Sequence, residues 1–381
     1  MGRSPGRIIA ILLALAGLGL ILVYVAILPE RRQREEPVGV ASPAATPLPT
    51  ATETVAPAAI PPTRALADAS ELPLAYRDRF GVTGKPEDVL MAADIGLPFG
   101  SFSTWLMHLD PVIPPGAFLW QMIRVSEEGP RPSRAEIEAA IDSAPGAAWI
   151  IGNEPDVIHQ DNVTPQRYAE IYHELYVLIK QRDPSALVAI GGVTQPTPLR
   201  RAYLDAVLDG YEARYGAPMP VDVWNVHAFI LREERDSWGV DIPPGMDDEL
   251  AIRYEIGDHL DMEIFRQLIF DFRAWMAERG YGDRPLLVSE YGMLMPYEYG
   301  FTEAQVAGFM TATFDFFLKT RGPTGYPADD NRLVQWWQWF VVDDDEHEEW
   351  RPTFLVDRES RTLTPLGETF ASYVRNLDHE P

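Results

Sequence analysis

Residues 148–155 read AWIIGNEP, an apolar run that ends in an amide, a carboxylate and a proline. A continuous apolar run of this length is typical of a strand that is buried on both faces. The proline has no backbone N–H to donate, so the strand has to end there. Residues 285–292, PLLVSEYG, follow the same plan, with a glutamate at the end of an apolar run. Two buried strands that each end in a glutamate therefore determine the fold that we expect.

Six further runs rich in Val, Ile, Phe and Trp lie between residue 72 and the C-terminus. In chain order the eight predicted strands are Arg79–Val82, Phe99–Trp105, Phe118–Val125, Ala148–Asn153, Ala186–Val193, Val221–Phe229, Pro285–Glu290 and Leu333–Phe340. Helical patterns lie between most of them, namely one that begins at Ser133, one from Thr164-Pro165 to Arg182, and Leu199–Tyr215, Asp261–Arg279 and Thr302–Lys319. This alternation predicts an α/β protein with a (β/α)8 TIM barrel. A doubly wound open sheet is the alternative, but no strand–helix junction carries a glycine-rich phosphate loop.

The two glutamates close the fourth and the seventh predicted strands. Active sites of such barrels lie at the C-terminal ends of the strands, so Glu154 and Glu290 should converge there. Because alternate residues of a strand share a face, we expect Val288 and Glu290 to point the same way. Two converging carboxylates are sufficient to cleave a glycosidic bond. One protonates the leaving oxygen, while the other attacks the anomeric carbon or activates water.

Asn153-Glu154-Pro155 and Ser289-Glu290-Tyr291-Gly292 resemble the signatures of glycoside hydrolase clan A. The resemblance spans the region from Leu72 to the C-terminus. It implies a retaining mechanism with Glu154 as acid/base and Glu290 as nucleophile, and it implies that Asn153 hydrogen-bonds the sugar hydroxyl next to the reacting carbon. Within the clan, residues 150–156 are most similar to an endo-β-1,3-glucanase family with an alkali-sensitive-linkage type domain.

The same resemblance suggests further contacts with the sugar. Many clan members have a histidine on strand six that is followed two residues later by a tyrosine, and this chain has His227 and Phe229. A hydroxyl that would orient the nucleophile is therefore missing, and His227 taken alone is also compatible with an ordinary core histidine. The resemblance suggests that Trp339 forms the platform under the sugar. We add Tyr291, next to the nucleophile, as a candidate substrate contact.

Two loops are expected to shape the groove. Residues 230–259 carry Trp238 and Tyr254, whose rings could stack on further sugars. Residues 343–349 are almost entirely acidic, but their spacing matches no EF-hand, so a solvated loop is favoured over a calcium site. No His-x-His or His-Glu-x-x-His pair indicates a catalytic metal, and no Gly-x-Ser-x-Gly motif indicates a serine hydrolase. We expect neither a metal nor a cofactor.

The formal net charge is −25 and the chain contains no cysteine. An acidic surface repels nucleic acid and anionic membrane surfaces, so nucleic acid is excluded as a partner and a neutral carbohydrate is compatible. The absence of cysteine rules out disulfides, a thiol nucleophile and cysteine zinc sites. We expect the protein to be monomeric.

The N-terminal part of the sequence differs from the rest. Residues 8–28 are apolar throughout, and at about 1.5 Å per residue they match the thickness of a bilayer core. We predict a short cytoplasmic segment at 1–7, a transmembrane anchor at 8–28 and a disordered Pro/Ala/Thr-rich linker at 29–71. The barrel at 72–381 would then lie outside the cell, attached to the membrane. Secretion after cleavage of a signal peptide is the alternative.

The sequence as a whole predicts a retaining glycoside hydrolase that acts on a β-linked glycan. A catalytically inactive barrel that binds glycan at the cell surface is the competing hypothesis, although a binding module has no need for both glutamates.

Overall fold

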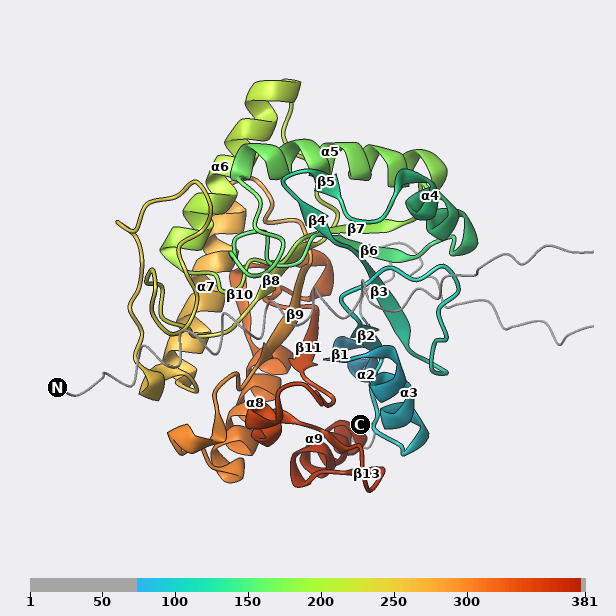
Figure 1. Cartoon of the computed structure of the whole chain (residues 1–381), viewed down its shortest axis with the longest axis vertical. Coiled ribbons are helices and arrows are strands. Elements are labelled where there is room, and N and C mark those ends of the chain that lie inside the picture. The colour runs from blue at the N-terminus through green and yellow to red at the C-terminus, as the bar shows by residue number, and fades with distance from the viewer. Residues whose placement is uncertain (1–73, 378–381) are drawn as a thin grey trace, which may run out of the picture.

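The computed structural model describes residues 74–377, in which parallel strands lie in the middle and helices surround them (Figure 1). The barrel strands are β1 (Phe80–Thr83), β2 (Ser101–Ser103), β3 (Phe118–Ile123), β6 (Ala148–Ile151), β7 (Leu187–Ile190), β8 (Trp224–His227), β9 (Leu286–Gly292) and β11 (Trp336–Phe340). Their hydrogen-bonded order is β7-β6-β3-β2-β1-β11-β9-β8, and each of these pairings is parallel. The end strands β7 and β8 approach each other through the parallel bridges Ala189–Val223 and Val193–Val226. The predicted eight-stranded barrel is confirmed, since every predicted strand overlaps one of these.

Helices connect most of the strands along the outside of the ring. They are α2 (Tyr76–Arg79), α3 (Pro86–Asp94), α4 (Arg134–Ser143), α5 (Pro165–Arg182), α6 (Pro198–Tyr215), α7 (Met262–Glu278), α8 (Glu303–Lys319) and α9 (Pro365–Leu377). A capping box at the start of α4, in which Ser133 and Glu136 satisfy each other's backbone N–H groups, explains the predicted helix start at Ser133. Helices α4 to α8 were predicted from the sequence, whereas α2, α3 and α9 were not. β2 is followed by a loop instead of a helix.

The apolar side chains form two separate cores, one inside the ring and one between the ring and the helices. The inner core contains Trp120 and Trp336, whose rings meet edge to face at 5.6 Å, and the barrel is therefore filled rather than hollow. The outer core includes Val288, Tyr291 and Trp339.

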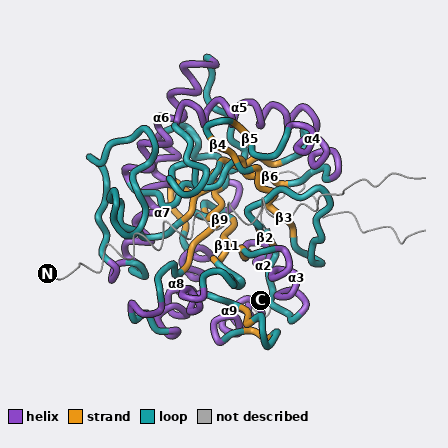
Figure 2. Tube along the Cα trace, in the orientation of Figure 1, coloured by secondary structure: helices purple, strands orange, loops and turns teal. Residues whose placement is uncertain are grey.

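Short elements extend the loops around the barrel. Two hairpins, β4 (Val125–Ser126) with β5 (Gly129–Pro130) and β12 (Val356–Asp357) with β13 (Thr362–Leu363), follow β3 and β11, and β10 (Arg321–Tyr326) lies between α8 and β11. The 3-10 turns are η1 (Ile256–Asp258), η2 (Tyr297–Tyr299), η3 (Pro327–Asp329) and η4 (Glu348–Thr353). The long segment between β8 and α7 is mostly irregular and is drawn in teal in Figure 2.

The predicted cytoplasmic segment at 1–7, the predicted anchor at 8–28 and the predicted linker at 29–71 all lie outside the described residues. None of the helices between residues 74 and 377 combines the length and the apolar character that a membrane crossing requires.

Candidate active site

Glu154 lies in a tight turn directly after β6. Gly152 and Glu154 both adopt left-handed backbone conformations, with φ of 89° and 45°. The turn is held by two backbone hydrogen bonds, from Asn153 N–H to Asp161 Oδ2 at 2.7 Å and from Glu154 N–H to the Gly192 carbonyl at 3.1 Å. A residue other than glycine rarely adopts a left-handed backbone conformation without such hydrogen bonds. The turn therefore aims a buried Glu154 carboxylate across the end of the barrel.

Glu290 reaches the same place from β9 because that strand contains a bulge. β8 pairs Val226 with Val288 but pairs the next residue, His227, with Glu290, so Ser289 is an extra residue in β9. The expectation that Val288 and Glu290 share a face was therefore wrong: Val288 packs in the outer core, whereas Glu290 faces His227. A bulge re-aims the side chains that follow it, which simple alternation does not anticipate.

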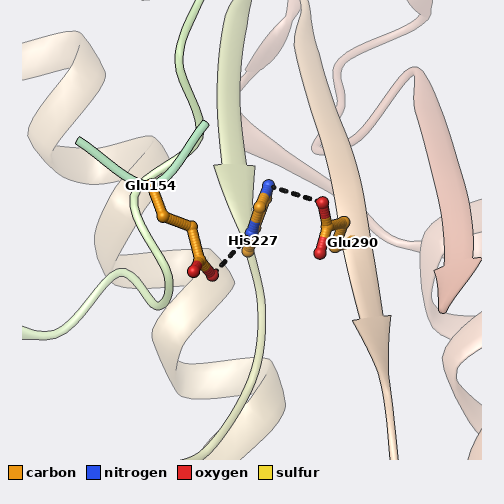
Figure 3. A group of neighbouring side chains, drawn as sticks. All are labelled: Glu154, His227 and Glu290. Carbon is orange, nitrogen blue, oxygen red and sulfur yellow. Dashed lines mark hydrogen bonds and ion pairs between the residues drawn. The ribbon is translucent and has the colours of Figure 1, made fainter. Parts of the chain in front are cut away.

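His227 lies between the two carboxylates (Figure 3). Its Nδ1 is 2.9 Å from Glu154 Oε1 and its Nε2 is 3.5 Å from Glu290 Oε1, and the ring has no solvent exposure. We call these three residues the acid–histidine–acid group. Their facing atoms all lie within 4.8 Å of one another. Residues 154, 227 and 290, which the sequence places near the ends of barrel strands, therefore lie together in one group.

The pKa values of this group are shifted in different directions. Burial raises the pKa of Glu290 to about 7, repulsion from Glu154 adds to this, and the charge of His227 opposes it. Burial acts in the same direction on Glu154, but the hydrogen bonds from His227 and Thr194 outweigh it and hold the pKa of Glu154 below its ordinary value. Burial lowers the pKa of His227, but the two carboxylates outweigh this and raise it. The group therefore favours a cationic histidine beside an ionised Glu154, with the proton on Glu290.

A metal ion does not fit this group well, although three potential ligands of two types, carboxylate and imidazole, are present. The two carboxylates face different nitrogens of the His227 ring and lie on opposite sides of it (Figure 3). Metal ligands have to converge on one point. The arrangement is instead a hydrogen bond between Nδ1 and Glu154 with a longer ion pair, at 3.5 Å, between Nε2 and Glu290.

A polar network supports Glu154 from behind. The Thr194 hydroxyl donates to Glu154 Oε1, and the Thr194 backbone N–H faces the carboxylate of Asp156 at 3.2 Å. Arg200 pairs with Asp156 at 2.8 Å and with Glu233 at 2.8 Å, and all three side chains are fully buried. Burial raises the pKa of Asp156 to about 6, against the opposing charge of Arg200. Glu154 is thus the outermost member of a buried charged network.

Glu233 also fastens the long loop that follows β8. Its Oε1 accepts hydrogen bonds from Gln195, Thr197 and Arg200, and its Oε2 accepts the Ile252 backbone N–H at 2.7 Å. The Glu233 backbone N–H in turn donates to the Ile252 carbonyl at 3.0 Å. One buried carboxylate therefore joins the two ends of the segment 234–251 to the barrel.

Aromatic side chains surround Glu290 on its other side. The Trp105 indole N–H donates to Glu290 Oε1 at 2.8 Å, and its ring lies 6.1 Å from Phe340. Phe340 is also 5.8 Å from Phe229 and 5.9 Å from Trp350. These rings are of the kind on which sugar rings stack, and they lie next to the acid–histidine–acid group.

The structure does not bring every predicted substrate contact to this place. Tyr291 and Trp339 are fully buried, and their rings pack against each other at 5.3 Å in the outer core. The Trp339 indole N–H donates to the Thr353 carbonyl, so the aromatic residue that β11 presents to Trp105 is Phe340. Trp238 is half-buried in the loop after β8. Asn153 is next to Glu154, and its Oδ1 is buried without a hydrogen-bond partner among the described residues.

Trp105 and Thr194 were not identified from the sequence as site residues. Trp105 ends the predicted strand Phe99–Trp105, and Thr194 directly follows the predicted strand Ala186–Val193. The rule that located the two glutamates, a polar group where a barrel strand ends, would have located these residues too.

Comparisons with known proteins agree with the fold. No model of a known protein family matches the chain, and no curated protein matches it in sequence. Several solved structures of glycoside hydrolase family GH128 do match it. A curdlan-specific exo-β-1,3-glucanase from Blastomyces gilchristii, solved with glucose, is 18% identical with a TM-score of 0.53, and the match covers 78% of this chain and 100% of that one.

Two bacterial structures give a similar result. An endo-β-1,3-glucanase from Amycolatopsis mediterranei in complex with laminarihexaose is 16% identical with a TM-score of 0.51, over 77% of this chain and 99% of that one. An endo-β-1,3-glucanase from Sorangium cellulosum is 14% identical with a TM-score of 0.50, over 77% and 98%. Identities this low establish a shared fold. The predicted resemblance to clan A endo-β-1,3-glucanases is confirmed at that level.

Proposed function

We propose that the barrel is a retaining glycoside hydrolase that cleaves a β-linked glycan. The observation that carries the proposal is the pair of buried glutamates whose facing oxygens lie within 4.8 Å at the C-terminal end of the barrel strands. Retaining enzymes hold their two carboxyl groups about 5–5.5 Å apart, whereas inverting enzymes need about 6.5–9.5 Å to admit a water. The separation supports direct attack by a carboxylate.

In the proposed mechanism Glu290 attacks the anomeric carbon while Glu154 gives its proton to the leaving oxygen. A covalent ester between Glu290 and the sugar forms, and the leaving group departs as an alcohol. Glu154 then takes a proton from water, the water oxygen attacks the anomeric carbon, and the ester breaks to release the sugar and the Glu290 carboxylate. The contacts with Thr194, Trp105 and His227 all fall on the Oε1 atoms of the two glutamates, which supports Oε2 as the reacting oxygen of each.

One observation favours the opposite distribution of roles. The raised pKa of Glu290 and the lowered pKa of Glu154 would suit Glu290 as the acid and Glu154 as the nucleophile. The resemblance of the two motifs to clan A supports the first distribution, and we retain it. The three groups titrate together, so a bound sugar that contacts one of them redistributes the protons of all three.

The stereochemistry of azide products distinguishes these two assignments. With an activated aryl β-glucoside, Glu290→Ala should yield the α-glycosyl azide, because azide enters from the face that the nucleophile has left open. Glu154→Ala should yield the β-glycosyl azide, because azide attacks the covalent intermediate. NMR of the products reads the configuration. The reverse pattern would assign Glu154 as nucleophile, and a wild-type chain inactive on every glycan tested would favour the glycan-binding hypothesis.

The linkage is proposed from the structural neighbours. The Amycolatopsis mediterranei protein was solved as two variants, one with laminarihexaose and the other with laminaritriose and laminaribiose. By analogy we propose β-1,3-linked glucan as the substrate of this chain. Hydrolysis of laminarin compared with β-1,4- and β-1,6-linked glucans tests this, and equal rates on all three would contradict it.

We also propose where in the cell the protein is located. The apolar run at 8–28 and the Pro/Ala/Thr-rich segment at 29–71 support a membrane-anchored enzyme that faces outward. Protease added to intact cells should remove the barrel from the membrane fraction. Recovery of the barrel in the medium, without residues 8–28, would indicate cleavage instead.

A further inference from the structure

The turn after β2 places an indole against Glu290. Trp105 has a left-handed backbone conformation with φ of 59°, which is unusual for a large side chain. Its Nε1–H donates to Glu290 Oε1 at 2.8 Å. Such a conformation persists only where surrounding contacts hold it in place. The contacts of this turn therefore show how the indole of Trp105 is kept against Glu290.

Gln121 on β3 provides the main support. Its amide oxygen accepts the His108 backbone N–H, and its amide nitrogen donates to the His108 carbonyl, both at 2.9 Å. The Gln121 side chain is buried, so both bonds are shielded from water. The Thr104 hydroxyl also meets His108 Nε2 at 2.7 Å. Residues 104–108 are therefore fixed to the barrel on both sides of Trp105.

Both contacts of the Glu290 carboxylate fall on one of its two oxygens. Trp105 Nε1 and His227 Nε2 lie 2.8 and 3.5 Å from the same oxygen, Oε1 of Glu290. Phe340 packs against the indole at 6.1 Å and limits its movement. Two directions of approach to one oxygen restrict rotation of the carboxylate and leave the other oxygen, Oε2, to face a reactant.

We propose that Trp105 is the positioning residue of Glu290, which fixes Oε1 so that Oε2 is the atom that attacks the anomeric carbon. Its catalytic consequence rests on the proposed function, whereas the contact itself does not. A donor to the charged form of a carboxyl stabilises that form. Trp105 therefore also counteracts the effect of burial and keeps Glu290 available in its ionised state.

The replacement Trp105→Phe tests this, because it removes the N–H and keeps an aromatic ring next to Phe340. We expect kcat/KM on a β-glucan to fall about 10- to 100-fold, as for the loss of a hydrogen bond to a charged group. The basic limb of the pH–rate profile follows the higher pKa of the pair, that of Glu290, and should move to higher pH because Glu290 then ionises less readily. A role in packing alone would lower activity or stability without moving that limb.

Trp275→Phe is the matched control. The Trp275 indole N–H also donates to a carboxylate, Asp205 Oδ1, at 2.8 Å, but this pair lies on the outer helices. The control should keep the wild-type pH profile and kcat/KM. An equal loss of activity in both variants, with unmoved limbs, would overturn the proposal.

A second measurement is independent of hydrolysis. In protein with ¹³C-labelled glutamate carboxyls, the Glu290 signal is assigned by its disappearance in Glu290→Gln. Its apparent pKa should rise by about one unit in Trp105→Phe. An unchanged titration would overturn the positioning role, whereas a shifted titration in a chain that hydrolyses no glycan would uphold the contact and refute the proposed function.

Discussion

Glu154 and Glu290 face each other across one histidine, but the protein surrounds them differently. Glu154 is backed by a charged and polar network that runs through Thr194, Asp156 and Arg200. Glu290 receives one indole N–H, and aromatic rings occupy much of the space around that contact. Burial raises the pKa of both carboxyls, but at Glu154 the hydrogen bond and charge of His227, followed by Thr194 and Arg200, outweigh it, whereas the pKa of Glu290 stays at about 7. The difference teaches that the groups in contact with each carboxylate, more than the carboxylates themselves, determine which one holds a proton.

Breaking the network behind Glu154 should have the largest effect on stability. Arg200→Met leaves Asp156 and Glu233 buried without their cation, and we expect a loss of about 3–5 kcal/mol in the free energy of unfolding. Urea denaturation at pH 7 measures it. The control is Arg134→Met, whose partner Glu138 is on the surface, with an expected change of about 0.5 kcal/mol or less. Similar losses in both variants would contradict a dependence on burial.

Neutral replacements of the two acids should change stability in opposite directions. Because the folded-state pKa of Glu290 is raised, the protonated form is favoured on folding, so wild-type stability falls as pH rises from about 4.5 through about 7. Glu290→Gln avoids that loss and should be more stable than wild type at pH 8, by on the order of 2 kcal/mol.

Glu154→Gln should do the reverse. The pKa of Glu154 is lowered, so its ionised form contributes stability above its ordinary pKa, and that contribution is lost as pH falls through the folded-state pKa. The variant should be less stable than wild type at pH 8, and the difference should shrink in acid. Thermal unfolding of both variants from pH 4 to 8 tests the pair of signs, and shifts of the same sign would show that the two surroundings do not differ in this way.

Removing the Thr194 hydroxyl should have the smallest effect of these changes, and it tests one contact that Glu154 has and Glu290 lacks. Thr194→Val keeps the shape of the side chain and removes the donor to Glu154 Oε1, so the pKa of Glu154 should rise. Because Glu154 has the lower pKa of the pair, the acidic limb of the pH–rate profile should move to higher pH, with a change in kcat/KM of about 10-fold or less. Thr313→Val, at a buried threonine that contacts Tyr291, is the control and should leave the limb in place. A limb that stays fixed in Thr194→Val would indicate that Glu154 does not control it.

The barrel could be predicted from the sequence because its strands are short, apolar and separated by capped helices. Ser133 and Thr164-Pro165 mark helix starts by local chemistry, and the structure begins α4 and α5 directly after Ser133 and Thr164. Polar residues at strand ends likewise indicated residues 154 and 290, and the structure brings them together. These signals are local, so a single sequence carries them.

The finer geometry depends on pairing between strands, which a single sequence does not reveal. Ser289 is an extra residue relative to β8, and the pairing of β11 with β9 also shifts between Trp337 and Trp339. Alternation counted along the chain therefore misplaces Val288, and it does not distinguish Trp339 from Phe340. His227 and Glu290 are neighbours because β8 pairs directly with β9, whereas Glu154 reaches His227 only because the end strands β7 and β8 approach each other and close the ring.

The hydrogen bonds of Glu233 at the base of the long loop determine which residues of that loop can change in sequence without disturbing the barrel. Because Glu233 and Ile252 hydrogen-bond to each other at the base of the loop, the tip at 234–251 leaves and returns to the barrel at one place. Exchanges at the exposed residues 247–250 should leave the two glutamates undisturbed, whereas Val240 and Ile242 are buried and the Asp241 carbonyl accepts a hydrogen bond from Arg200 at 2.9 Å. The middle of the loop is therefore tied to the network behind Glu154, and only its exposed end is free to vary.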